Sequence, residues 1–275
     1  MIPKAHIVAW RSVAPWVSDA QVEQDLIISR ALVAIFQDPF LSKGLAFRGG
    51  TALHKLYLNL SRRYSDDIDL VQIEPGGIGP IIDKVQEILN SLLGKPRRKQ
   101  TGDAVTLTYR MESEGPPVVP MRIKVEINTR EHFAVDGFRK QPFSVDSRWF
   151  QGSCLITTYT LEELLGTKVR ALYQRRKGRD LLDLWLGLTG GKANATRIVE
   201  IFHGYMKSEG RVVDGRLYEK NLRDKMKHRG FISDIEPLLP ADVNYDIQEA
   251  FDLVNREIVS KMEMASSAGL RKKAQ

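Results

Sequence analysis

The chain has 275 residues, of which 43% are hydrophobic and 27% are charged, and this balance excludes an intrinsically disordered protein. Its net charge of +7, with a pI of about 9.4, is compatible with a nucleic-acid partner but does not by itself identify one. A single cysteine excludes an intrachain disulfide, and the sequence contains neither a signal peptide nor the ~20 apolar residues of a membrane span, so we expect a cytoplasmic protein with no membrane partner.

The first predicted element is a long helix that begins at Ser18, a favourable N-cap residue. Its apolar residues recur at helical spacing, which predicts a face packed on a sheet. Pro39 ends the helix. Two acids on it, Glu23 and Asp25, are expected to be solvated or structural. Residues 1–16, before the helix, contain two prolines and are predicted to be irregular.

A short strand then leads into the turn Gly49-Gly50-Thr51, and a helix is predicted from Thr51 to Leu60. Glycines leave the backbone accessible, and the free N–H groups at a helix N-terminus favour an anion. The turn is therefore a candidate phosphate site, although a Gly-Gly turn alone is usually only a turn. The adjacent Arg62 and Arg63 could hold phosphate or RNA, or could simply be solvated.

The segment Ser65-Asp66-Asp67-Ile68-Asp69-Leu70 reads as a strand. Side chains two residues apart on a strand share a face, so both Asp67 and Asp69 reach one spot. Two neighbouring carboxylates repel each other unless one is protonated or a cation neutralises them, and Mg²⁺ commonly takes one or two carboxylates together with substrate phosphates. An Asp-x-Asp alone is more often a solvated strand end, but a preceding Gly-Gly-Thr turn and short helix predict a metal–nucleotide site, with Ser65 lining the phosphate pocket.

Five further segments are predicted before residue 159. An amphipathic helix spans Ile81–Leu93, and Lys95–Lys99 forms a basic loop that is either an RNA phosphate contact or only a charged turn. Period-two alternation predicts strands at 104–111 and 121–128. On the second strand, apolar residues share one face and charged residues the other. Residues 131–158 read as a loop-rich connection.

The remainder of the chain is predicted to be helical. Thr160 is a good N-cap for a helix that carries Lys168, and the next helix carries Asp180 and Asp183 on one face because they are three residues apart. By residue chemistry alone, the simplest interpretation is an interhelical salt-bridge network that joins these three residues to Arg175 and Arg179. Later helices are predicted at 196–207, 218–228 and 246–264.

Two of these blocks carry a resemblance to a known family. Gly49-Gly50-Thr51-x-Leu53 followed by Ser65-x-Asp67-Ile68-Asp69-Leu70 resembles the nucleotidyltransferase toxins of the AbiEii/MenT type, in the DNA polymerase beta superfamily. The later block, from Lys168 through Asp180 to Trp185, is similar to the same family, in the family's order. The resemblance covers most of the first 190 residues and only loosely extends beyond them.

The resemblance implies an α+β fold: a polymerase-beta-like nucleotidyltransferase mixed sheet with flanking helices, followed by a helical C-terminal domain. Strands are predicted mainly before residue 128 and helices after residue 160, which is consistent with that order. We therefore expect a nucleotidyltransferase domain at 1–150 and a helical domain at 151–275 that completes the active-site cleft.

The resemblance also implies roles for individual residues. Catalytic roles fall to Asp67, Asp69, Lys168 and Asp183. Nucleotide binding falls to Gly49, Gly50, Thr51, Ser65, Lys168 and Asp180. Asp67 and Asp69 would bind Mg²⁺ or Mn²⁺, with Glu126 as a third carboxylate from a neighbouring strand. Glu126 could equally pair with Lys124 or with a nearby arginine.

The implied function is that of a toxin in a toxin–antitoxin system. Such an enzyme transfers NMP from an NTP substrate to an RNA acceptor, here the tRNA 3′ end, which blocks translation, and a cognate antitoxin is encoded nearby. Two alternatives are a catalytically inactive nucleotide- or RNA-binding module and a metal-dependent phosphohydrolase. The intact carboxylates and Lys168 argue against the first, and the shortage of clustered histidines argues against the second.

Overall fold

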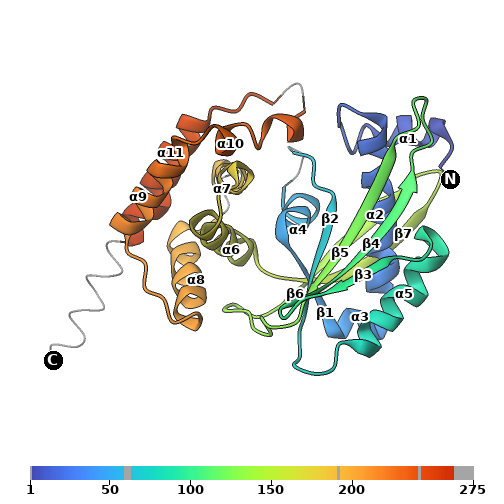
Figure 1. Cartoon of the computed structure of the whole chain (residues 1–275), viewed down its shortest axis with the longest axis horizontal. Coiled ribbons are helices and arrows are strands. Elements are labelled where there is room, and N and C mark those ends of the chain that lie inside the picture. Colours follow the sequence, from blue (N-terminus) through green and yellow to red (C-terminus); the bar gives the residue numbers. More distant parts are fainter. Residues whose placement is uncertain (1, 59–62, 191–192, 241–242, 263–275) are drawn as a thin grey trace. The chain divides into compact units, whose positions relative to one another are not determined.

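The computed structural model describes residues 2–58, 63–190, 193–240 and 243–262. The chain divides into two compact units, Met1–Tyr159 and Thr160–Gln275 (Figure 1). No helix within the described ranges is both long enough and apolar enough to cross a membrane. Arg62 and the expected helix ends at residues 60 and 264 lie outside these ranges.

The first unit is built on a seven-stranded mixed sheet with the strand order β3-β4-β5-β2-β1-β7-β6. The pairs β2–β5 and β1–β7 are parallel and the other neighbours are antiparallel. A mixed sheet with flanking helices confirms the expected fold class. The strands are β1 Leu45–Arg48, β2 Asp67–Gln72, β3 Arg97–Gln100, β4 Ala104–Glu112, β5 Pro120–Asn128, β6 Arg139–Asp146 and β7 Gln151–Thr158.

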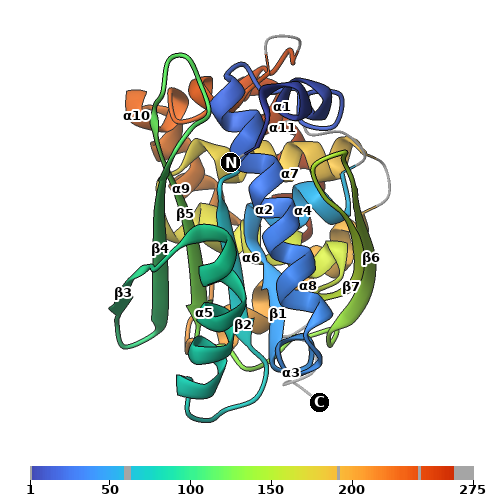
Figure 2. The same cartoon turned by 90° about the vertical axis from the view of Figure 1, so that its right-hand side faces the viewer.

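Helices cover the two faces of this sheet unequally (Figures 1 and 2). Helices α2, α3 and α5 lie against one face, whereas α4 lies on the other, over β1 and β2. A helix was expected at residues 51–60. The observed helix α4 is shorter and begins two residues earlier, at the Gly-Gly turn itself. The helices of this unit are α1 Lys4–Trp10, α2 Asp19–Gln37, α3 Pro39–Gly44, α4 Gly49–Leu56 and α5 Gly79–Leu93.

The core lies between the sheet and α2 and α5. Burial alternates strictly along β4 and β5, so each strand turns an apolar row to the helices and a polar row to the opposite face, as the sequence pattern predicted. The buried side chains of the two strands are Val105, Leu107, Tyr109, Met121, Ile123, Val125 and Ile127.

Three predictions for this unit are wrong. Residues 4–10 form helix α1, and the basic segment at 97–100 is the edge strand β3 and not a loop. Residues 139–158 form the β6–β7 hairpin where a loop-rich connection was expected. The two strands were missed because they are exposed to solvent. No residue of β3 is buried and β6 buries only Val145, so neither strand has the apolar alternation by which strands are recognised in a sequence. Because β7 belongs to the sheet, the first unit extends past residue 150.

The two acids of α2 are structural, not solvated. Both are buried, and Asp25 accepts a hydrogen bond from Trp10 Nε1 at 3.0 Å and pairs with Lys55 Nζ at 2.9 Å. Lys55 also donates to Ser29 at 2.9 Å. These contacts hold α1 and α4 against α2. They also give the buried Asp25 carboxylate the hydrogen bond and the opposite charge that a buried charge requires.

The second unit is helical, as expected. Helix α6 packs against α7 and α8, and α11 packs against α7. Thr160 caps α6 as predicted, since its hydroxyl accepts from the Glu163 N–H at 3.0 Å. The elements are α6 Leu161–Gln174, α7 Gly178–Thr189, α8 Ala195–Ser208, α9 Gly215–Met226, α10 Arg229–Ile232, the 3₁₀ turn η1 Glu236–Leu238, α11 Ile247–Val254 and the π-helical turn η2 Asn255–Val259.

Candidate active site

Two carboxylates lie side by side on β2. Asp67 and Asp69 are half-buried on the polar face of the sheet, while Ile68 and Leu70 are buried on the other. This arrangement confirms that both carboxylates share a face. The ladder places Asp69 beside Glu126 on β5, and neighbours in register share a face, so Glu126 points the same way.

Lys124 is a cation directly beside these acids in the ladder. It is the register partner of Asp67, and its Nζ lies 2.6 Å from Glu126 Oε2. Burial alone would lower the pKa of Lys124, but the hydrogen bond to Glu126 and the charges of Asp67, Glu126 and Asp69 outweigh it, so the pKa is raised. The ion pair with Lys124 that was foreseen for Glu126 is therefore present.

Gly49 is required by two independent constraints. Its φ of +79° lies in the left-handed region that L side chains rarely adopt. A Cβ at this position would lie 2.2 Å from Asp69 Oδ2, well inside contact distance. The glycine thus allows the chain to turn into α4 directly beside the Asp69 carboxylate. The start of α4, with its free backbone N–H groups, is thereby placed at the acid pair.

The hydroxyl of Thr51 ties the start of α4 to β2. Thr51 Oγ1 donates to the Asp67 carbonyl oxygen at 2.6 Å and lies 2.7 Å from Ser65 Oγ. Because the single Thr51 hydroxyl proton is used for Asp67, Ser65 must be the donor of the second bond. The Thr51 side chain is 1% exposed, so its contribution at this site is to hold the turn in place.

Arg63 lies beside the turn and is not solvated. It is 3% exposed, and its Nη1 donates to the Tyr64 carbonyl at 2.9 Å. A Cβ at Gly50 would lie 2.2 Å from Arg63 Nη2 and 3.4 Å from Ser65 Oγ. Gly50 is therefore needed for the space that the Arg63 guanidinium group occupies, whereas its backbone conformation does not require glycine.

Arg48 was missed by the sequence analysis. It ends β1 immediately before the turn, and it is the register partner of Asp69, so it belongs to the same face. Its Nη1 lies 2.6 Å from Glu131 Oε2. The available signal was its position next to Gly49, but only the pairing of β1 with β2 shows that it flanks the carboxylates.

The described residues do not include a group of three or more His, Cys, Asp or Glu arranged to hold a metal ion. Glu126 is thus not gathered with Asp67 and Asp69 into a three-carboxylate cluster. Two adjacent carboxylates nevertheless match the binding of Mg²⁺, which commonly takes one or two protein carboxylates and completes its shell with water and substrate phosphates.

The second unit contains a four-charge cluster in which one lysine and two aspartates are buried and one arginine is exposed. Lys168 Nζ lies 2.8 Å from Asp183 Oδ2 and 3.2 Å from Asp180 Oδ1, and both aspartates are fully buried. Arg175 forms a bidentate salt bridge with Asp180: its Nε donates to Oδ2 at 2.7 Å and its Nη2 donates to Oδ1 at 2.8 Å. The salt-bridge network expected from residue chemistry is therefore present. Arg179 makes no ion pair with these acids among the described residues.

Asp180 is held as an anion. Burial by itself would raise its pKa, but the charge of Lys168 and the hydrogen bond from Arg175 more than offset burial, so the pKa of Asp180 is lowered. Two cations and two anions balance, which leaves the cluster close to neutral without an outside ion. Removing one of the three buried members, Lys168, Asp180 or Asp183, would leave a buried charge without compensation.

Helix α6, which carries Lys168, is fixed near its C-terminal end as well. Tyr218 Oη donates to the Val169 carbonyl at 3.0 Å, and Lys225 Nζ donates to the carbonyls of Leu172 and Tyr173. A cation at a helix C-terminus is stabilised by the free carbonyls there. Burial lowers the pKa of Lys225 to about 8. Lys168 is thus held on a helix with partners at both ends.

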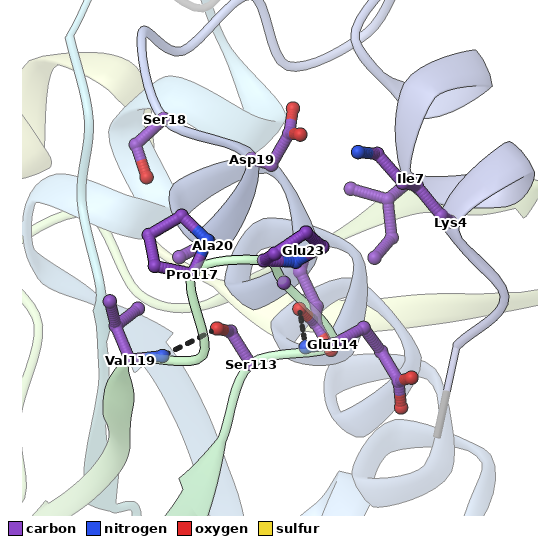
Figure 3. A pocket seen from close by; sticks show the side chains of 12 residues that line it. Lys4, Ile7, Ser18, Asp19, Ala20, Glu23, Ser113, Glu114, Pro117 and Val119 are labelled. Carbon is purple, nitrogen blue, oxygen red and sulfur yellow. Dashed lines mark hydrogen bonds between the residues drawn. The ribbon is translucent and has the colours of Figure 1, made fainter.

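A separate hollow of about 270 Å³ in the first unit lies between α1, α2 and the β4–β5 turn (Figure 3). Glu23 lines it and accepts from the Glu114 N–H at 3.0 Å. Burial is the main reason that the pKa of Glu23 is raised. Neither Asp67 nor Asp69 belongs to its lining, so this hollow is distinct from the carboxylate site.

A mixed sheet that carries two aspartates on one strand, beside a Gly-Gly helix start, is typical of a polymerase-beta-type nucleotidyltransferase. Residues 30–253 match the family model described as nucleotidyl transferase AbiEii toxin, type IV TA system. The chain belongs to this AbiEii family, and it is a nucleotidyltransferase toxin of a type IV toxin–antitoxin family. The family resemblance predicted from the two motif blocks is confirmed.

Solved structures show the same fold. JHP933 from Helicobacter pylori superposes with a TM-score of 0.57 at 17% identity, covering 94% of this chain and 99% of that one. MenT4, a nucleotidyltransferase toxin from Mycobacterium tuberculosis H37Rv, superposes with a TM-score of 0.57 at 14% identity, covering 96% and 99%. No curated protein matches the chain.

Replacing Gly49 with alanine should be far more damaging than replacing Gly50. Gly49→Ala combines a strained backbone, costing about 1–2 kcal/mol, with a clash against the Asp69 carboxylate. Gly50→Ala meets the end of the flexible Arg63 side chain, which can move aside. We expect Gly49→Ala to lower the melting temperature and abolish nucleotidyl transfer, and Gly50→Ala to keep the fold. Equal activity in the two variants would contradict the close approach of Gly49 to Asp69.

The Asp180 cluster predicts an acid-sensitive stability. A carboxyl with a lowered folded pKa stabilises the fold above its unfolded pKa of ~3.9, and that contribution is lost as the pH falls through the folded pKa. Asp180→Asn should cost about 3–5 kcal/mol at pH 7, because it leaves buried Lys168 short of a partner, and should flatten the acid limb of the stability profile.

Urea unfolding between pH 7 and pH 3 measures this effect. Asp103→Asn is the matched control, because Asp103 pairs with Arg130 in an exposed position at 3.6 Å and should change stability by less than about 1 kcal/mol. Parallel pH profiles for the wild type and Asp180→Asn would show that the cluster does not hold Asp180 ionised.

Proposed function

We propose that this toxin transfers NMP from an NTP to an RNA acceptor, the tRNA 3′ end, in a reaction that depends on a divalent cation, and that translation stops as a result. The observation that carries the proposal is the pair Asp67 and Asp69, which share one face of β2 beside the start of α4. A cognate antitoxin is the expected protein partner, in keeping with the family.

Asp67 and Asp69 would hold the cation, which we propose to be Mg²⁺ or Mn²⁺. Their carboxylate oxygens are hard ligands, and their spacing places both on the same side of the strand. When bound, such an ion neutralises phosphate charge and favours ionisation of an acceptor hydroxyl. Glu126 would join them only by releasing Lys124, to which it is now paired at 2.6 Å.

The phosphates of the NTP would lie at the turn that begins α4. The backbone of Gly49 and Gly50 carries no side chain that would keep a phosphate away, and helix N-termini favour anions. Arg48, on the adjacent strand, and Lys124, beside Asp67, bring positive charge to the same face. The Ser65 hydroxyl donates to Thr51, so Ser65 positions the turn. It could bind phosphate only if its hydrogen bond to Thr51 were replaced by a hydrogen bond to a phosphate oxygen.

Lys168 is proposed to stabilise the charge that develops on the transferred phosphoryl group and the leaving pyrophosphate. Its contact with Asp183 at 2.8 Å supports an orienting role for that aspartate, because Asp180 is already engaged by Arg175. Asp180 would act indirectly on the nucleotide, by holding Lys168 in place.

The decisive experiment incubates the protein with Mg²⁺, labelled NTPs and total RNA. Labelled RNA supports transfer, free phosphate supports a phosphohydrolase, and neither product supports a binding module. Asp67→Asn keeps the shape but removes a charged ligand. Replacing a residue that only supports a metal ligand typically lowers activity by about 10–100-fold. We therefore expect Asp67→Asn, which changes a ligand itself, to lower the transfer rate by more than about 100-fold.

Asp66→Asn is the control, because it removes the same charge from the adjacent residue. We expect it to transfer label at close to the wild-type rate. A Lys168→Met variant in the same assay tests the second unit and should also lose transfer. Label incorporation by Asp67→Asn near the wild-type rate would contradict the assignment of the site.

A further inference from the structure

The polar face that carries Asp67 continues across β5 and β4 to the sheet edge at β3. In the ladders, Asp67 pairs with Lys124, Lys124 with Thr108, and Thr108 with Arg97. A second row links Lys99 through Thr106 to Glu126. Register partners share a face, so the basic side chains of the edge strand and the carboxylates of β2 belong to one continuous surface.

Four cations on this surface form no ion pair within the described part of the chain. Arg97, Lys99, Arg110 and Arg122 are exposed, and none of them makes an ion pair with a described residue. Many other surface cations are paired, as with Lys84 and Glu87 at 2.8 Å. The acids on the same face of β4 and β5 are Glu112 and Glu126, and Glu126 is already engaged by Lys124. The part of the face on β3, β4 and β5 therefore carries more positive than negative side chains.

Protection of the sheet edge does not account for this pattern. Charged residues on an edge strand prevent pairing with another sheet, which would explain Arg97 and Lys99. Arg110 and Arg122, however, lie on the inner strands β4 and β5 and are direct register partners. Like charges directly opposite each other destabilise a sheet, so this pair opposes folding and requires another explanation.

The arginine pair also adjoins the carboxylate strand. A hollow of about 420 Å³ is lined by Arg110, Arg122, Gln24 and Asp66, together with apolar residues. Asp66 immediately precedes Asp67 and is the acid in that lining. The hollow thus places two arginines next to the start of β2.

We propose that this surface, defined by Arg97, Lys99, Arg110 and Arg122, binds the phosphate backbone of the RNA acceptor. The proposal rests on the proposed function, because the occupant is the RNA that receives the nucleotide. Three interstrand steps of about 4.8 Å separate Arg97 from Asp67, or about 14 Å, so the charges suit an extended polyanion. Thr106 and Thr108 add hydroxyl donors between the cations.

The character of the binding follows from the side chains present. The face positions of β3, β4 and β5 carry no aromatic residue on which bases could stack. Contacts with phosphate position RNA without reading its sequence. This surface should therefore bind RNA with little sequence preference and with a steep dependence on salt, while the choice of acceptor is made elsewhere.

The test is equilibrium binding of the full chain to a fluorescein-labelled single-stranded RNA and to labelled tRNA, by anisotropy across a salt series. Two double variants remove charge from the surface: Arg97→Gln with Lys99→Gln, and Arg110→Gln with Arg122→Gln. The matched control is Arg98→Gln with Lys84→Gln. Arg98 lies on the same edge strand but faces the other way, and Lys84 lies on α5, which covers that opposite face. All three double variants lose the same net charge.

We expect each surface variant to bind RNA more weakly, with the slope of log K against log salt reduced by about 0.7–0.9 for each phosphate contact removed. The control should keep the wild-type slope. Surface variants that match the control, or a wild-type protein that binds neither RNA, would overturn the proposal. Anionic lipid vesicles form a separate arm, and loss of vesicle binding with unchanged RNA binding would assign the surface to a membrane and overturn it too. Binding without any transfer of label would contradict only the proposed function.

Discussion

The close approach of Gly49 to Asp69 is the constraint on which the candidate site depends. The left-handed glycine lets β1 turn into α4 with almost no space between backbone and carboxylate. Thr51 then fixes the same helix start to the Asp67 carbonyl. Two acids, a helix N-terminus and the cations Arg48 and Lys124 are thereby brought to one face of the sheet. In such an arrangement the acids repel each other, and the surrounding positive groups limit that cost.

The second unit solves a similar electrostatic problem by neutralisation. Its cluster buries Lys168 with two aspartates and adds Arg175, so the formal charges cancel. Breaking a buried network of this kind is costly, because removing one member leaves an uncompensated charge. Lys168 is also held on a helix that Thr160 caps and that Tyr218 and Lys225 anchor.

Local periodicity allowed part of this account to be predicted from the sequence. The Asp67–Asp69 pair, the alternation of β5 and the shared helix face of Asp180 and Asp183 all follow from spacings of two or three residues. The role of Arg48 could not be predicted, because it depends on how β1 and β2 pair. The basic surface depends in the same way on the register of β3, β4 and β5, and the exposed β6–β7 hairpin has too little apolar alternation to be recognised.

The central claim is that Asp67 and Asp69 hold the cation that accompanies the NTP at the start of α4. A crystal structure with Mn²⁺ and a non-hydrolysable NTP analogue tests it most directly, because Mn²⁺ is identified by its anomalous scattering. We predict an anomalous peak between the two carboxylates, with the triphosphate against Gly49 and Gly50. Mn²⁺ and nucleotide bound elsewhere, with Asp67 and Asp69 in contact only with protein side chains, would contradict the account.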